Sequence, residues 1–232
     1  MSLGELPTRT TMRGYWKCED VNDSSGNARN LTNLNTVTFN AGKFNNAADY
    51  GSSGTNKGLG TTTNIMSALK PTSFTVSLWF KPNSTANIAT RTLAQISTAF
   101  DSTGSLFSVY YIIAAGVFYV GSSNNLTTTA ADTQVIFSSL PSTDEWINVV
   151  AVKTDATHLL IYVNGKLGTN NVGSGTETSA AGTYKFTIGN TRSLNGQVWT
   201  KVDDVIVEER IWSADEVRRY YTQGKGRYET YQ

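Results

Sequence analysis

Hydrophobic and polar residues alternate in many short stretches of this chain, and a period of two residues is the pattern of half-buried β-strands. Residues 74–80, with the sequence F-T-V-S-L-W-F, show it best: the even-numbered positions are all apolar, whereas the odd-numbered positions are Thr, Ser and Trp. Pro82 ends this strand. We expect further strands at residues 13–18, 37–39, 47–50, 57–59, 92–96, 106–112, 117–121, 134–137, 146–152, 159–163, 184–188 and 202–207.

The last of these strands carries a carboxylate in an unusual place. Val205 and Val207 share one strand face, and the same alternation predicts that Asp203 points to that face. An inward carboxylate is costly unless positive charge meets it. The sequence therefore predicts either a bound cation or a buried Arg or Lys beside Asp203.

Two local signals fix a helix and a hairpin near the end of the chain. Ser213 and Glu216 form an S-x-x-E capping box, which predicts a helix start, and Gly224 is a natural stop. Asn164-Gly165 lies between two apolar strands and predicts a tight hairpin turn with positive φ angles.

A dozen or more short strands and one late helix predict an all-β fold: a two-sheet antiparallel β-sandwich with one short C-terminal helix. The 232 residues show no internal repeat, no heptad pattern and no mid-chain linker. We expect an irregular leader at residues 1–12, a single domain at 13–222 and a polar tail at 223–232. The leader is a candidate arm that grips a neighbouring molecule.

The composition excludes several classes of partner and cofactor. The net charge is +1 and only 16% of residues are charged, so no strong field would attract nucleic acid or an anionic membrane. No apolar run approaches the length of a membrane helix, so membrane insertion is not expected. One cysteine, Cys18, excludes an intrachain disulfide and is expected to be a small buried hydrophobe. With one histidine, His158, a zinc site is not expected. The start of the chain lacks the features of a signal peptide.

Short segments in a fixed order resemble a known family. They are Y-W-K-C-E-D at 15–20, D-S-S-G-N at 23–27, G-K-F at 42–44, F-T-V-S-L-W-F-K at 74–81, W-I-N-V-V-A-V at 146–152, L-I-Y-V-N-G-K at 160–166, I-G at 188–189 and V-D-D-V at 202–205, followed by S-A-D-E-V at 213–217. This order is similar to the laminin-G-like, concanavalin A-like jelly-roll superfamily, over roughly residues 13–222.

The resemblance implies a jelly roll of two antiparallel sheets, often with a structural calcium between the chain start and the last strand. It also implies binding of sugars or proteins, or a spacer role in extracellular or virion proteins, and so an extracellular or virion-surface location. Two features depart from the pattern: Cys18 stands where Leu is usual, and residues 197–201 look like an insertion after Gly196.

Five carboxylates are candidate calcium ligands. Calcium takes six to eight oxygen ligands from carboxylates, amides, backbone carbonyls and water. Strand alternation places Asp20 and Asp203 inward, and Glu19, Asp23 and Asp204 lie near them in sequence. If they bind calcium, the ion raises the melting temperature.

The alternative is that these are ordinary turn carboxylates with a salt bridge to Arg13 or Lys201.

Catalysis is not expected from the motifs present. The E-x-D-x-x-E strand motif of related glucanases is absent, and Glu208-Glu209 would point to opposite faces of a strand. No G-x-S-x-G occurs, and the position of His158 is typical of an exposed turn. Glycoside hydrolysis is therefore kept only as a remote alternative.

Two tryptophans are candidate ligand platforms. Trp79 lies opposite the apolar face of its strand, where it would stack on a sugar or a partner if exposed; the alternative is that a second layer or a long loop covers it. Trp199, in the apparent insertion, is the better candidate for an exposed aromatic.

The sequence thus indicates a non-catalytic, lectin-like module for carbohydrate or protein binding. The alternative is a structural component of an assembly, such as a phage virion decoration or tail protein.

Overall fold

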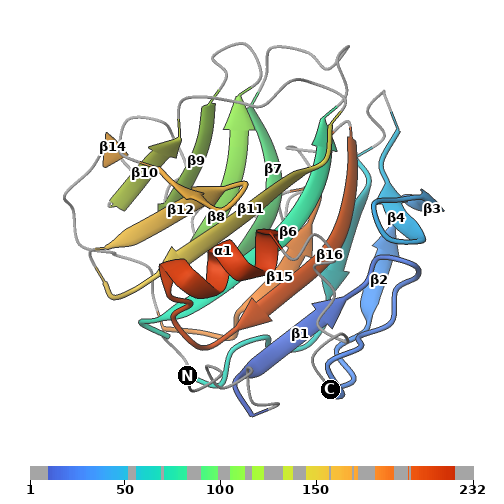
Figure 1. Ribbon diagram of the computed structural model, residues 1–232. Coiled ribbons are helices and arrows are strands. Elements are labelled where there is room, and N and C mark those ends of the chain that lie inside the picture. Colours follow the sequence, from blue (N-terminus) through green and yellow to red (C-terminus); the bar gives the residue numbers. More distant parts are fainter. Residues whose placement is uncertain are drawn as a thin grey trace.

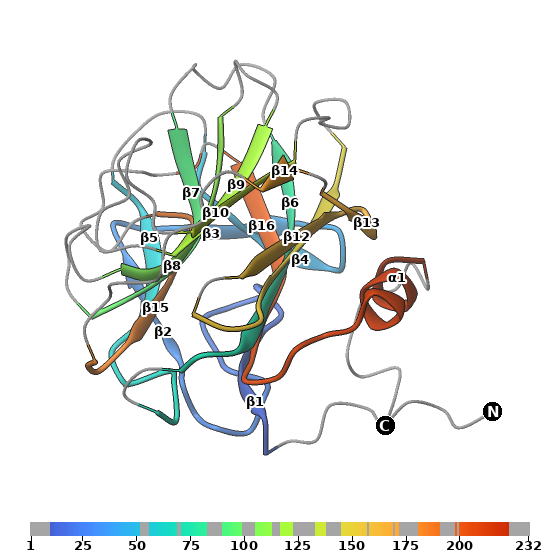
Figure 2. The same cartoon turned by 90° about the vertical axis from the view of Figure 1, so that its left-hand side faces the viewer.

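In the part of the chain that the structure describes, two antiparallel sheets of eight strands each face one another, and a single helix packs against the outside of one sheet (Figures 1 and 2). This computed structural model describes residues 10–51, 56–68, 71–82, 90–98, 105–112, 117–122, 133–137, 145–156, 158–168, 170–171, 181–190, 198 and 200–222. The all-β sandwich with one short C-terminal helix is confirmed. The predicted tail lies outside the described residues, as does the predicted leader up to position 9.

Sheet A has the strand order β13-β12-β11-β6-β16-β4-β3, and β1 also pairs with β16. Its strands are β1 (Met12–Trp16), β3 (Thr38–Ala41), β4 (Asn46–Asp49), β6 (Phe74–Pro82), β11 (Ile147–Lys153), β12 (Leu159–Val163), β13 (Lys166–Leu167) and β16 (Thr200–Glu208).

Sheet B has the order β14-β10-β9-β8-β7-β15-β5-β2. Its strands are β2 (Leu31–Leu34), β5 (Gly58–Thr61), β7 (Thr90–Ser97), β8 (Ser105–Ile112), β9 (Val117–Ser122), β10 (Thr133–Phe137), β14 (Asn170–Asn171) and β15 (Lys185–Ile188).

The main core lies between the sheets and follows the alternation read from the sequence. The even-numbered residues of β6 belong to it: Phe74, Val76, Leu78 and Phe80. Burying each large apolar side chain stabilises the fold by about 1.5–3 kcal/mol. Cys18 is also in this core, as predicted, and burial, followed by the charges of nearby aspartates, raises the pKa of its thiol.

A second apolar cluster joins the outer face of sheet A to α1 (Ala214–Thr222). Its members are Met12, Tyr15, Val150, Val152, Tyr162, Ile206, Trp212, Val217 and Tyr220. The predicted capping box starts this helix: Ser213 N donates to Glu216 Oε2 at 2.7 Å, and Glu216 N donates to Ser213 Oγ at 3.2 Å.

A β-bulge in β16 overturns the predicted orientation of Asp203. Asp203 pairs with Trp79 and Ile206 with Ser77, so β16 has one residue more than β6 between these pairs. The extra residue is accommodated at Asp204, whose φ is +51°. Asp203 consequently lies on the outer face of sheet A, opposite to the core valines, and the prediction that it shares their face is wrong.

The hairpin between β12 and β13 turns at Asn164 and Gly165, with φ angles of +49° and +74°, as their sequence predicts. Within the described part of the chain, no helix is long and apolar enough to cross a membrane.

Candidate functional site

Asp203 closes the turn between β3 and β4. Its Oδ2 accepts hydrogen bonds from the backbone N–H groups of Lys43 and Phe44, both at 2.9 Å. Successive N–H groups that converge on one oxygen form an anion-binding nest, and Asn45, with φ at +47°, curls the turn. Gly42 is needed because a Cβ there would lie 2.7 Å from Asp203 Oδ2. Backbone amides thus supply part of the positive potential that Asp203 requires.

Lys43 supplies a side-chain cation next to the same carboxylate. Its Nζ lies 4.0 Å from the centroid of the Trp79 ring and 5.4 Å from that of Phe44. Burial lowers the pKa of Lys43, whereas the charges of Asp203 and Asp204 act in the opposite direction. A half-buried lysine, one of the two alternatives drawn from the sequence, therefore lies beside Asp203.

Trp79 is not an exposed platform. Its side chain is 2% exposed. The ring stacks on Tyr221 of α1 at 5.9 Å, and Phe44 contacts it at 6.2 Å in an edge-on arrangement. The alternative that a further layer covers Trp79 is confirmed, and its assignment as a ligand platform is wrong. Trp199, the other candidate, lies outside the described residues.

Asp204 ties three elements together through its buried carboxylate. Tyr15 of β1 donates its hydroxyl to Oδ1 at 2.8 Å, and Tyr220 of α1 donates to Oδ2 at 2.6 Å. Burial and then the charge of Asp204 raise the pKa of Tyr220, so this phenol stays protonated. Asp204 therefore anchors the first strand and the helix to β16.

Asp20 and Glu19 follow the end of β1. Asp20 is exposed and accepts from the backbone and side-chain nitrogens of Asn22, both at 2.7 Å. The inward placement of Asp20 is wrong because β1 ends at Trp16 and the chain then turns. Glu19 Oε1 accepts from Asn45 Nδ2 at 2.8 Å and so holds the same turn as Asp203 does.

Asp23 organises the next turn. It accepts from the backbone N–H groups of Tyr15, Ser25 and Arg29 at 3.1, 2.8 and 2.9 Å, and from the Ser25 hydroxyl at 2.8 Å. These four hydrogen bonds fill the acceptor capacity of the carboxylate, so Asp23 has a structural role in this turn.

The five candidate ligands do not fit a calcium site. In the described residues, which include all five, no group of three or more His, Cys, Asp or Glu side chains could hold a metal ion. Both oxygens of Asp23 and of Asp204 already accept hydrogen bonds from N–H or O–H donors of the protein. The predicted alternative salt bridges also differ: Arg13 pairs with Glu209, and Lys201 pairs with Asp49 at 3.7 Å.

Calcium dependence is a solution property that a melting experiment tests directly. Because these carboxylates do not meet, we expect the same melting temperature in excess calcium and in chelator, measured by circular dichroism, with magnesium as the control cation. A melting temperature that rises in calcium alone would contradict this expectation and support the calcium site first inferred from the sequence.

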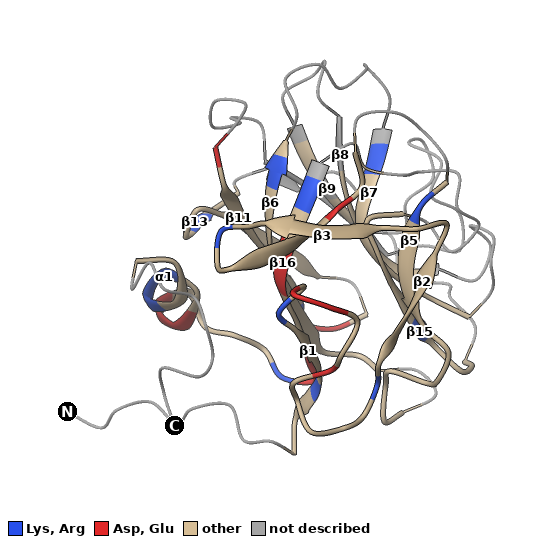
Figure 3. Ribbon diagram, turned by 90° about the vertical axis from the view of Figure 1, so that its right-hand side faces the viewer, with Lys and Arg blue, Asp and Glu red and all other residues tan. Residues whose placement is uncertain are grey.

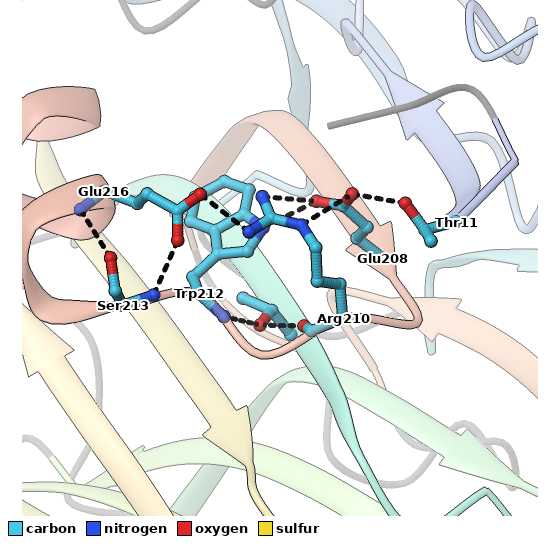
Figure 4. A network of polar contacts seen from close by, with 7 residues as sticks. Thr11, Glu208, Arg210, Trp212, Ser213 and Glu216 are labelled. Carbon is cyan, nitrogen blue, oxygen red and sulfur yellow. Dashed lines mark hydrogen bonds and ion pairs between the residues drawn. The ribbon is translucent and has the colours of Figure 1, made fainter. Parts of the chain in front are cut away.

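A buried glutamate at the end of β16 is the centre of the polar network in Figure 4. Glu208 is fully buried and accepts from Thr11 Oγ1 at 2.7 Å and from Trp212 Nε1 at 2.6 Å. Arg210 Nε donates to Glu208 at 3.2 Å, and its Nη1 donates to Glu216 at 2.6 Å. The network fastens the chain start and the beginning of α1 to the last strand.

Glu209 is engaged on the other side of the chain. It accepts from Arg13 Nε at 2.7 Å and from Ser67 N at 2.6 Å. Glu208 and Glu209 thus stabilise the fold separately and do not form an acid–base pair across a shared space. The ring of His158 is exposed and contacts Asp155, as expected for a turn histidine.

One edge of the sandwich is formed by a stretch of chain without charged residues, and Asp49 of the neighbouring strand accepts from Asn40 Nδ2 there at 3.2 Å. Residues 30–42 contain no Asp, Glu, Lys or Arg and include β2 and β3, the terminal strands of the two sheets, which are tan in Figure 3. Asn35 Nδ2 donates to Asn56 O at 3.0 Å. The exposed residues here, named the polar edge, are Thr32, Asn33, Asn35, Thr36, Thr38, Asn40 and Asn56.

Sequence reasoning missed two features of the site. Lys43 stood inside a recognised segment, but no local pattern shows that it meets Trp79. The polar edge has no charged residue over positions 30–42, but residues 102–131 form a longer uncharged run, so absence of charge alone does not identify this edge from sequence.

Comparison with known proteins supports the fold and the family. No curated protein matches the sequence. The fold is similar to that of the botulinum neurotoxin serotype D binding domain (15% identity, TM-score 0.66, covering 93% of this chain and 52% of that one). It is also similar to the binding domain of botulinum neurotoxin DC, solved with rat synaptotagmin II (16%, 0.67, 94% and 52%).

A third similar structure is described as showing that cell entry of botulinum neurotoxin type C depends on two ganglioside molecules (15% identity, TM-score 0.67, 93% of this chain and 52% of that one). The chain therefore spans about half the length of these structures. Residues 53–218 match the family described as the concanavalin A-like lectin/glucanases superfamily. On this match, over most of its length, the chain belongs to that superfamily.

Proposed function

We propose that this protein is a non-catalytic, lectin-like module that binds a neutral glycan at the polar edge. The observation that carries the proposal is the chemistry of this edge: exposed amides and hydroxyls, with no charged residue over positions 30–42. Amide and hydroxyl groups both donate to and accept from sugar hydroxyls. The toxin domains of the same fold, whose descriptions name rat synaptotagmin II and gangliosides, support binding in general.

The absence of catalysis is part of the proposal. The adjacent glutamates at the end of β16 are bound to Thr11, Arg210 and Trp212 or to Arg13 and Ser67. A glycosidase needs two carboxyl groups that flank one bond of the sugar. Release of reducing sugar from any glycan that the protein binds would contradict this part of the proposal.

The glycan site is tested with paired glycine variants. Asn35 and Asn56 have φ angles of +58° and +55°, so glycine accepts the same backbone; it removes the two side-chain amides and, with them, the hydrogen bond from Asn35 Nδ2 to Asn56 O. After a glycan array has identified a ligand, we expect Asn35→Gly with Asn56→Gly to weaken binding about tenfold or more, from two hydrogen bonds of about 1 kcal/mol each. Calorimetric titration gives the affinity.

Asn164→Gly is the matched control, because Asn164 also has a positive φ, +49°, but lies in the turn after β12, at the opposite end of sheet A. Its affinity should equal that of the unmodified protein. Equal affinity in all three proteins would remove the polar edge from the proposal, and no bound glycan on the array would overturn the glycan proposal itself.

A second candidate function is a structural subunit of an assembly, such as a virion component. It is favoured by β2 and β3, two edge strands without the lysines or prolines that protect edges from pairing. Light scattering distinguishes the two functions: a monomer at all concentrations argues against self-assembly, and a defined oligomer or larger particle supports it.

A further inference from the structure

Two neighbouring residues on the outer face of sheet A each carry a buried polar atom, and the two atoms are complementary. Trp79 on β6 and Asn148 on β11 are directly paired in register. The Trp79 indole N–H and the Asn148 side-chain oxygen are both buried, and neither has a hydrogen-bond partner in the described part of the structure. More than nine in ten buried polar groups in proteins are hydrogen-bonded, so such a pair requires an explanation.

The hydrogen bond that the Asn148 side chain makes to Leu78 shows that its remaining, unbonded atom is the amide oxygen. Asn148 Nδ2 donates to the backbone oxygen of Leu78 at 3.2 Å. A carbonyl oxygen can only accept, so the amide nitrogen must face Leu78 and Oδ1 must face away from it. The pair is therefore one donor and one acceptor, which are the two groups that a single hydroxyl bridges.

Two side chains cover the ring of Trp79. Tyr221 stacks on the Trp79 ring at 5.9 Å, and the Lys43 ammonium lies 4.0 Å from its centroid. Both contacts use the faces of the ring and leave its edge, where the N–H lies, directed elsewhere. Gly165 lies so near Tyr221 that an added Cβ would be 3.1 Å from its ring, so the end of α1 is held tightly over this region.

We propose that one water molecule is bound between Trp79 Nε1–H and Asn148 Oδ1 as an internal part of the contact between sheet A and the end of α1. Water accepts from the indole and donates to the amide oxygen, so one molecule satisfies both groups. Buried waters with two or more polar partners are integral components of folded proteins.

Nuclear magnetic resonance of the full chain with ¹⁵N-labelled tryptophan tests this site. We expect the Trp79 indole N–H to show a cross-peak to water, with opposite signs in the laboratory-frame and rotating-frame experiments, as direct contact with a long-lived water requires. Trp79→Phe assigns the signal. The indoles of Trp16 and Trp212 are internal controls that should show none, because they donate to Arg29 O at 3.0 Å and to Glu208 at 2.6 Å.

Asn148→Leu is the second arm of the experiment. It removes the acceptor, so the Trp79 cross-peak should disappear while the indole signal itself remains. A Trp79 indole that resembles the two controls in the unmodified protein would overturn the proposal. A cross-peak that persists in Asn148→Leu would overturn it as well, since the water would then not be held by Asn148.

Discussion

Replacing Glu208 with alanine is expected to lower the free energy of unfolding by about 3 kcal/mol or more. Glu208 is fully buried, and its removal leaves Thr11, Arg210 and Trp212 without their common acceptor. Breaking one side of a buried ion pair costs about 3–5 kcal/mol, and the lower part of that range applies because the Arg210 side chain is 28% exposed. Urea unfolding followed by circular dichroism measures the change.

Asp215→Ala is the matched control for Glu208→Ala. Asp215 also pairs with an arginine, Arg218, at 3.0 Å, but the two side chains are 72% and 66% exposed. An exposed pair of this kind contributes about 0–1 kcal/mol. Equal effects of the two substitutions would show that the buried network does not hold the last strand and the helix together.

Gly189→Ala is expected to destabilise the protein by about 3–5 kcal/mol, by strain and overpacking together. Gly189 has φ at +73°, where a side chain is strained, and an added Cβ would lie 2.1 Å from Tyr50 Cζ. Tyr50 cannot move aside easily, because it is fully buried and donates its hydroxyl to Ile188 O at 2.8 Å. Thermal and urea unfolding of the variant give the loss.

Gly26→Ala separates the two causes. Gly26 has φ at +86°, but nothing lies within 4 Å of an added Cβ. Only backbone strain remains, and this costs about 1–2 kcal/mol. We expect Gly189→Ala to lose more unfolding free energy than Gly26→Ala. Equal losses would show that the region around Tyr50 relaxes to make room for the added methyl group, and would contradict the expectation of overpacking there.

The regular strands were predictable from sequence because their alternation is a local property. In β6 each apolar position of the F-T-V-S-L-W-F run is in the core, and Trp79 is on the other face. The S-x-x-E capping box and the Asn164-Gly165 turn were equally local, and both are confirmed.

Strand β2 was missed because its sequence is that of a turn region. Residues 31–34 read L-T-N-L within an Asn-rich stretch, and they form a strand by pairing with β5. Strand β14 likewise lies in what reads as a polar loop. In both cases pairing with a distant strand overrides local preference.

The predicted orientation of Asp203 failed for a different reason. An uninterrupted run such as V-D-D-V-I-V gives no sign of a bulge, yet one extra residue at Asp204 reverses the side on which Asp203 lies. The partner of Asp203 was also beyond local reasoning, since the amides of Lys43 and Phe44 are about 160 residues away in sequence.

The pairing of β1 with β16 means that sheet A cannot be completed until nearly the whole chain has been synthesised. The first strand has its partner almost 200 positions later, with Thr11 bonded to Glu208. That partner also lies in the middle of sheet A, between β6 and β4. At about 5–20 residues per second, a ribosome needs roughly 10–40 s to deliver it. Until β16 has been synthesised, β1 and the strands that flank β16 in sheet A therefore have unpaired edges. During this time the nascent chain exposes surface that a chaperone could bind.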